Sequence, residues 1–98
     1  MKPKGLLVIT SQAAKRMQAY GCEVARGVGW KAVYPCWDID ERDDPATYVL
    51  TLIDETSTGD DETGLQRDIR FRRAEIVGYG KGHGVDAIHA TIQSALHA

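Results

Sequence analysis

The sequence predicts an α+β domain in which a helix, a three-stranded antiparallel meander and a C-terminal helix follow one another, with the helices on one face of the sheet. Three observations support this prediction: helical spacing of apolar residues after Ser11, three segments rich in β-branched and aromatic residues between positions 30 and 77, and helical spacing again from Val85 to Leu96. The 98 residues have the size of one domain, residues 1–98, which can bury about two-thirds of its unfolded surface.

The first helix is predicted to begin after Ser11, a natural N-cap, with Arg26 in its last turn and Gly27 as the C′ residue beyond its end. Before it, Leu6 to Thr10 contains enough β-branched residues for a short extra N-terminal strand, but the same residues could also open the helix. Gly21 inside the helix costs about 1 kcal/mol relative to alanine, which indicates close backbone packing or an earlier helix end. The apolar positions with helical spacing are Ala13, Met17, Tyr20, Val24 and Val28.

Two segments predict the first two strands. Trp30 to Trp37 is apolar at both alternating sets of positions, and Pro35 restricts this strand to a sheet edge or a bulge. Thr47 to Ile53 is rich in β-branched and large apolar residues and predicts the second strand. A long polar loop, Asp54 to Gln66, then leads to the third strand.

The third strand is predicted from Asp68 to Val77. Its apolar alternation changes phase at Arg72 and Arg73, which indicates a bulge near Arg72. The glycine-rich segment Gly78 to Gly84 predicts a hinge at which the chain reverses over the sheet. The final helix follows, and its predicted buried stripe consists of Val85, Ile88, Ile92, Ala95 and Leu96.

Composition indicates a soluble globular protein, because 43% hydrophobic and 27% charged residues are ordinary values for that class. The longest apolar run, Leu6 to Ile9, is too short for a membrane span or a signal-peptide core, so we expect a cytoplasmic location. Cys22 and Cys36 lack the CxxC spacing and are expected to be reduced, partly buried thiols.

Charged residues are unevenly distributed, although the formal net charge is only -2. Both strand connections are acidic and should lie at opposite ends of an antiparallel meander. The first carries Asp38, Asp40, Glu41, Asp43 and Asp44, and the second carries Asp54, Glu55, Asp60, Asp61 and Glu62. The positive charges that concentrate elsewhere are those of Arg67, Arg70, Arg72, Arg73 and Lys81.

The acidic clusters do not predict a metal site. Asp38-Ile-Asp40 begins like a calcium loop, but Arg42 stands where a third ligand belongs and Asp43 replaces the glycine of the sharp turn. We expect solvated loops, no bound metal and no cofactor. Catalysis is not expected either, because no spacing brings together the residue types of a nucleophile and its base, which are Cys22, Cys36, His83, His89 and His97. His89 borders the apolar stripe of the last helix and is expected to be a half-buried packing residue.

The glycine segment has a second interpretation as a phosphate cradle. Its N–H groups precede a helix N-terminus and Lys81 lies nearby, but Asp86 in the first turn would repel an anion. The chain also ends too soon after Gly84 for a nucleotide-binding βαβ unit. A hinge is therefore the favoured interpretation.

The predicted order of elements, with Gly78-Tyr-Gly-Lys-Gly before the final helix, resembles the double-stranded RNA-binding domain. The resemblance implies a shared topology from Ser11 to Leu96 and makes nucleic-acid binding the alternative function. That family places a lysine cluster at the start of its last helix to hold phosphates. The corresponding residues here are His83, Gly84, Val85 and Asp86.

No motif in the sequence specifies a reaction. We therefore expect a small non-catalytic binding or regulatory protein that acts through protein–protein contacts, comparable in size and composition to phage and mobile-element inhibitors. Trp30 and Tyr34 are assigned to the core, and the sheet edges predict a homodimer. Aromatic anchors and charge are what a protein interface needs, so the candidate binding residues, expected to meet an acidic protein surface, are Trp37, Arg70, Arg72, Arg73 and Lys81.

Overall fold

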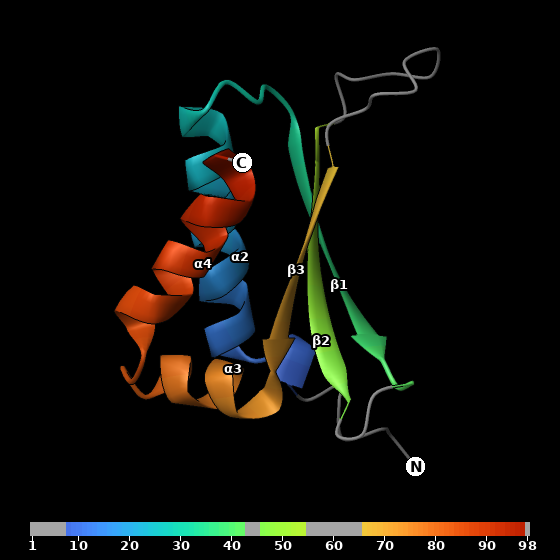
Figure 1. Cartoon of the computed structure of the whole chain (residues 1–98), viewed down its shortest axis with the longest axis vertical. Helices are drawn as coiled ribbons and strands as arrows, with labels where there is room; N and C mark the ends of the chain where they lie inside the picture. Colours follow the sequence, from blue (N-terminus) through green and yellow to red (C-terminus); the bar gives the residue numbers. More distant parts are fainter. Residues whose placement is uncertain (1–7, 43–45, 55–65, 98) are drawn as a thin grey trace.

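The computed structural model describes residues 8–42, 46–54 and 66–97. Their elements, in chain order, are α2 (Gln12–Gly27), β1 (Val33–Asp40), β2 (Thr47–Asp54), β3 (Gln66–Arg72), α3 (Arg73–Gly80) and α4 (Val85–His97). The strands form an antiparallel sheet in the order β1-β2-β3, and the helices cover one of its faces (Figure 1). The predicted α+β class, the meander and the one-sided helix layer are confirmed. None of the helices described is long and apolar enough to cross a membrane.

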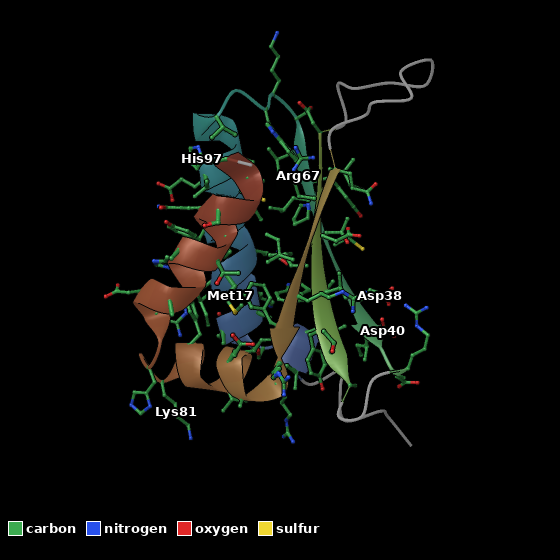
Figure 2. The ribbon with its side chains drawn as sticks, in the orientation of Figure 1. Met17, Asp38, Asp40, Arg67, Lys81 and His97 are labelled. Carbon is green, nitrogen blue, oxygen red and sulfur yellow. The ribbon has the colours of Figure 1, made fainter. Side chains whose placement is uncertain are left out.

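The core lies between the sheet and the helix layer. Helix α2 packs on β1 and β2, and α4 packs on β3. Met17 points from α2 into this space (Figure 2). The largest fully buried side chains are those of Phe71, Met17, Leu50, Leu52, Ile76 and Ile92, so β2 contributes two and every other element except β1 contributes one.

Helix α2 begins where the sequence predicts. The hydroxyl group of Ser11 accepts a hydrogen bond from the N–H of Ala14 at 3.2 Å, as an N-cap does. The expectation of close packing at Gly21 is also confirmed. A Cβ atom at this position would lie 3.0 Å from Cδ1 of Leu52 on the sheet, so glycine lets the helix approach β2.

The end of α2 differs from the prediction. Gly27 is the last helical residue, and Gly29, with a φ of +107°, takes the left-handed conformation that closes the helix. The N–H of Trp30 donates to the carbonyl oxygen of Ala25 at 3.0 Å, and the N–H of Gly29 donates to that of Arg26 at 3.1 Å. This pair of bonds is a Schellman motif, and it requires the positive φ two residues later than predicted.

The third strand ends five residues earlier than predicted. Strand β3 stops at Arg72, and α3 begins at Arg73, so the change of phase marks a transition from strand to helix and not a bulge. Glu75 caps the new helix, because its Oε1 accepts a hydrogen bond from the N–H of Arg72 at 2.8 Å. Ile76 and Tyr79, three residues apart, form its buried side.

The glycine segment is also divided differently. Gly78 and Gly80 belong to α3, and the chain reverses only at residues 81–84, between two helices. Gly82 and Gly84 have φ values of +82° and +69°, which L-residues with a side chain rarely adopt. The predicted reversal is present, but it turns α3 into α4 and does not connect the sheet to the last helix.

Three other predictions concern the connections. Val8 and Ile9 are helical, so no strand forms at the described part of Leu6 to Thr10. Asp54 is not at an exposed acidic tip: it is only 4% exposed, and its carboxylate accepts N–H groups of Lys31 and Ala32 at 3.4 and 3.3 Å. The remaining acidic residues of the second connection, and Asp43 and Asp44, lie outside the described residues.

Candidate binding surface on the open face of the sheet

One face of the sheet is turned away from the helices (Figure 1), and we call it the open face. Successive residues of a strand point to opposite sides, so this face receives the residues that alternate with the core positions. The register aligns them in four rows of three across the strands. The rows are Tyr34–Ile53–Gln66, Cys36–Thr51–Asp68, Asp38–Val49–Arg70 and Asp40–Thr47–Arg72.

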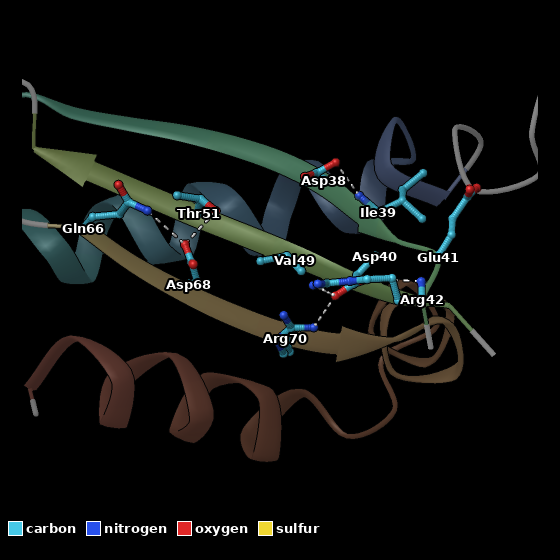
Figure 3. Close-up of a pocket in the computed structure, with 10 residues that line it drawn as sticks. All are labelled: Asp38, Ile39, Asp40, Glu41, Arg42, Val49, Thr51, Gln66, Asp68 and Arg70. Carbon is cyan, nitrogen blue, oxygen red and sulfur yellow. Dashed lines mark hydrogen bonds and ion pairs between the residues drawn. The ribbon is translucent and has the colours of Figure 1, made fainter. Parts of the chain in front are cut away.

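Asp40 is the centre of an ion-pair network at one end of the open face (Figure 3). Nε and Nη2 of Arg42 both donate to its carboxylate at 2.9 Å, and Nη1 of Arg70 donates from β3 at 3.1 Å. The guanidinium group of Arg42, its backbone N–H and the guanidinium group of Arg70 hold the pKa of Asp40 well below the usual range. The network therefore links both outer strands across β2.

Beside this network the open face is hollowed, with a volume of about 630 Å³ (Figure 3). Val49 lies at its floor and is only 8% exposed, although it is not part of the hydrophobic core. The carboxylate of Asp38 accepts the N–H of Ile39 at 2.8 Å, and that of Asp68 accepts the hydroxyl group of Thr51 at 2.9 Å. Both carboxylates are thus held in place by neutral donors.

Tyr34 stands at the other end of the open face and is 52% exposed. The sequence assigned it to the core together with Trp30, which is indeed buried. The assignment of Tyr34 is wrong because β1 begins at Val33, so its core positions are Val33, Pro35, Trp37 and Ile39. An aromatic side chain is therefore presented to solvent on the same face as the hollow.

The predicted binding residues do not form a single patch. Trp37 is on the helix side of β1 and packs against the core, with its ring centroid 6.1 Å from that of Phe71. Its indole N–H is buried, and no described residue accepts a hydrogen bond from it. Of the candidate cations, Arg70 alone reaches the hollow on the open face.

The other candidate cations surround α3. Arg72 and Arg73 are exposed at the junction of β3 and α3, and Lys81 follows the far end of this helix. Lys81 lies on the helix side of the molecule, whereas Asp38 and Asp40 lie on the sheet side (Figure 2). Within the described ranges, no ion pair to a carboxylate involves these three cations.

Sequence reasoning missed the contribution of the carboxylates. Asp38 and Asp40 were assigned to a solvated loop, but they are the last open-face residues of β1. The signal was available in the period of two that joins Tyr34, Cys36, Asp38 and Asp40. Extending the first strand by three residues beyond Trp37 would have placed both carboxylates beside the arginines of the third strand.

The two outer strands differ in how open their edges are. In a strand the N–H groups of alternate residues point to the same edge. On β1, Ile39 donates its N–H to Asp38, and Pro35, in the same phase, has no N–H to donate. A strand of another molecule that paired with this edge would find no N–H donor at Pro35 or at Ile39. The outer edge of β1 is therefore protected. The prediction that Pro35 belongs to an edge strand is confirmed.

The histidine expected to pack in the helix layer does so. His89 stacks on Tyr20 with ring centroids 3.7 Å apart, and its Nε2 lies 2.8 Å from the hydroxyl oxygen of Tyr79.

Cys22 is buried, and this burial raises the pKa of its thiol, whereas Cys36 is exposed on the open face. Among residues 8–42, 46–54 and 66–97, no group of three or more His, Cys, Asp or Glu side chains could hold a metal ion.

Comparison with known proteins adds no functional information: no family model, no curated protein and no solved structure matches the chain. The open face therefore has to be interpreted from its own chemistry.

Proposed function

We propose that the chain is a small non-catalytic regulatory protein of the cytoplasm that acts by binding another protein through the open face of its sheet. The observation that carries this proposal is the combination, on one uncovered face, of an exposed aromatic residue, Tyr34, and a hollow with fixed charges. Protein interfaces typically combine rigid aromatic anchors with charges that select the partner.

The charges of the open face are fixed before any partner arrives. Asp40 holds both arginines of the network, the backbone N–H of Ile39 holds the carboxylate of Asp38, and the hydroxyl group of Thr51 holds that of Asp68. A surface that is already ordered loses less side-chain entropy on binding, where each immobilised side chain costs about 0.5 to 1.5 kcal/mol. A domain of 98 residues that occupies a partner's surface fits the role of an inhibitor, such as those that phages and mobile elements carry.

The proposal includes a homodimer that forms through the edge of β3, because the edge of β1 is protected. Antiparallel pairing of two β3 strands would supply hydrogen-bond partners to the N–H and C=O groups along this edge. Light scattering at high micromolar concentration is expected to give twice the mass of the chain, and a monomer at that concentration would rule the dimer out.

A second candidate function, nucleic-acid binding, is favoured by the exposed cations around α3. Arg72, Arg73 and Lys81 flank both ends of this helix, which at 8 residues is about 12 Å long. Phosphate contacts by these groups would make binding strongly dependent on salt. A mobility assay with random duplex RNA and DNA at near-physiological salt tests this candidate, and we expect no shift with micromolar protein.

The protein-binding proposal is tested by photocrosslinking in cells. A photoreactive amino acid is placed at Thr51 on the open face in one variant and at Ala19, exposed on α2, in a second. We expect a crosslinked protein of defined mass only from position 51, with circular dichroism confirming that both variants fold. Crosslinks from position 19 alone would place the interface on the helix layer and refute the proposal.

A further inference from the structure

The charges that line the hollow on the open face are unbalanced. Four carboxylate groups line it against two guanidinium groups, which leaves a formal charge of −2. Both guanidinium groups bind the same carboxylate, that of Asp40. The other three carboxylates, those of Asp38, Glu41 and Asp68, form no ion pair with any described cation.

From this imbalance we infer that the partner presents a basic side chain, arginine or lysine, to the hollow between Asp38 and Asp68, above Val49. This inference rests on the proposed function and specifies the chemistry of the partner. It differs from the acidic partner that the arginines of the sequence predict, because Arg70 is already paired with Asp40. A basic group in the hollow gains two carboxylates, whereas an acidic group would meet three of its own sign.

The geometry of the hollow suits such a group. Asp38 and Asp68 belong to neighbouring rows on opposite outer strands, so they flank Val49 and Thr51 of β2 from both sides. Val49 offers an apolar floor for the aliphatic stem of an arginine or lysine, whose charged end remains near the rim. The hydrogen bonds to Ile39 and Thr51 each occupy one carboxylate oxygen, Oδ1 of Asp38 and Oδ1 of Asp68.

Tyr34 extends the inferred footprint along β1. The point midway between the rows of Asp38 and Asp68 lies about three residues further along β1 than Tyr34, a distance of about 10 Å. A partner segment that binds both features therefore carries an apolar side chain and a basic side chain about 10 Å apart.

An NMR titration with synthetic octapeptides tests the inference: the probe alternates glycine and arginine, and its counterpart alternates glycine and glutamate. We expect the arginine peptide to shift the backbone amides of Asp38, Val49, Thr51 and Asp68, and the glutamate peptide to leave them unchanged. The variant Asp38→Asn with Asp68→Asn keeps both internal hydrogen-bond acceptors but removes two charges. At about 0.5 kcal/mol for each exposed ion pair, it should weaken binding of the arginine peptide about fivefold.

The matched control is Glu23→Gln with Asp86→Asn, which removes two exposed charges from the helices and should leave the affinity unchanged. Equal weakening by the control would mean attraction by net charge alone and would overturn the inference. Shifts with the glutamate peptide, or none with the arginine peptide, would overturn it as well. If crosslinking from position 51 still captures a partner, these results contradict the basic side chain of the partner but not the proposed function. Failure of the inference can therefore be distinguished from failure of the proposed function.

Discussion

The close approach of α2 to the sheet at Gly21 gives a quantitative test of the packing. A Cβ atom at this position would lie 3.0 Å from Cδ1 of Leu52 and 3.7 Å from Cδ2 of Leu50, and both leucines are fully buried. Gly21→Ala gains about 1 kcal/mol of helix propensity but costs about 1 to 3 kcal/mol from overpacking. We therefore expect the free energy of unfolding to fall by about 1 kcal/mol.

Gly27→Ala is the matched control in the same helix, because nothing lies within 4 Å of its added Cβ atom. Both substitutions reduce the entropy of the unfolded chain equally, so their difference isolates the contact with Leu52. We expect Gly27→Ala to stabilise by about 0.5 to 1 kcal/mol, which shifts the melting temperature upward by about 2 to 8 °C. Urea unfolding followed by circular dichroism measures both, and an equal stabilisation by the two variants would refute the packing argument.

Two further predictions concern the ion-pair network and the helix layer. Because the pKa of Asp40 is lowered in the folded state, its contribution to stability is present above the unfolded value of about 4 and is lost as the pH falls through the folded value. Asp40→Asn should therefore reduce stability at pH 7 and flatten its fall in acid, and unchanged acid unfolding curves would contradict this. Tyr79→Phe removes the hydroxyl group beside Nε2 of His89 and should lower the free energy of unfolding, measured in urea, by about 1 kcal/mol. The NMR chemical shifts of the His89 imidazole ring should change in the same variant. A variant as stable as the original, with unchanged chemical shifts of the His89 ring, would mean that the hydrogen bond between Tyr79 and His89 does not form.

Much of the fold follows from local patterns in the sequence. The apolar stripe of α4 predicts its three buried residues, Ile88, Ile92 and Leu96. Apolar residues spaced three and four apart lie on one side of a helix, and this is the side that packs against the core. Ser11 predicts the start of α2 for a similar reason, since its hydroxyl group bonds within the same turn. Such features depend on contacts close in the sequence.

The transition at Arg72 could not be predicted in the same way. Ala74 to Val77 has the β-branched content of a strand, and two glycines follow it at positions 78 and 80, where each lowers helix propensity by about 1 kcal/mol. Tertiary contacts overrule this preference: Ile76 and Tyr79 are buried, and a Cβ atom on Gly80 would lie 3.0 Å from that of Ala13 on α2. Helix α3 thus depends on a neighbour that is distant in the sequence.

The candidate site was predicted only in part for a related reason. The sequence pointed to Arg70 but not to its partner, because Asp40 is 30 residues away and meets it across β2. The ion pair between Asp40 and Arg70 depends on the register of all three strands. Because the first strand was predicted to end three residues too early, at Trp37, Asp40 was not placed in the sheet. Tyr34 was assigned to the wrong face by the same uncertainty of phase.

Binding of a protein partner to the open face is tested most directly with the partner identified by crosslinking. The measurement is the dissociation constant of its complex with each of two variants of this protein. Thr51→Arg adds bulk and charge at the hollow, and Ala19→Arg adds the same group on the exposed side of α2. We predict that Thr51→Arg weakens binding at least about tenfold, equivalent to about 1.4 kcal/mol, and that Ala19→Arg leaves it unchanged. Weakening by Ala19→Arg with no effect of Thr51→Arg, in two variants of equal stability, would contradict the account.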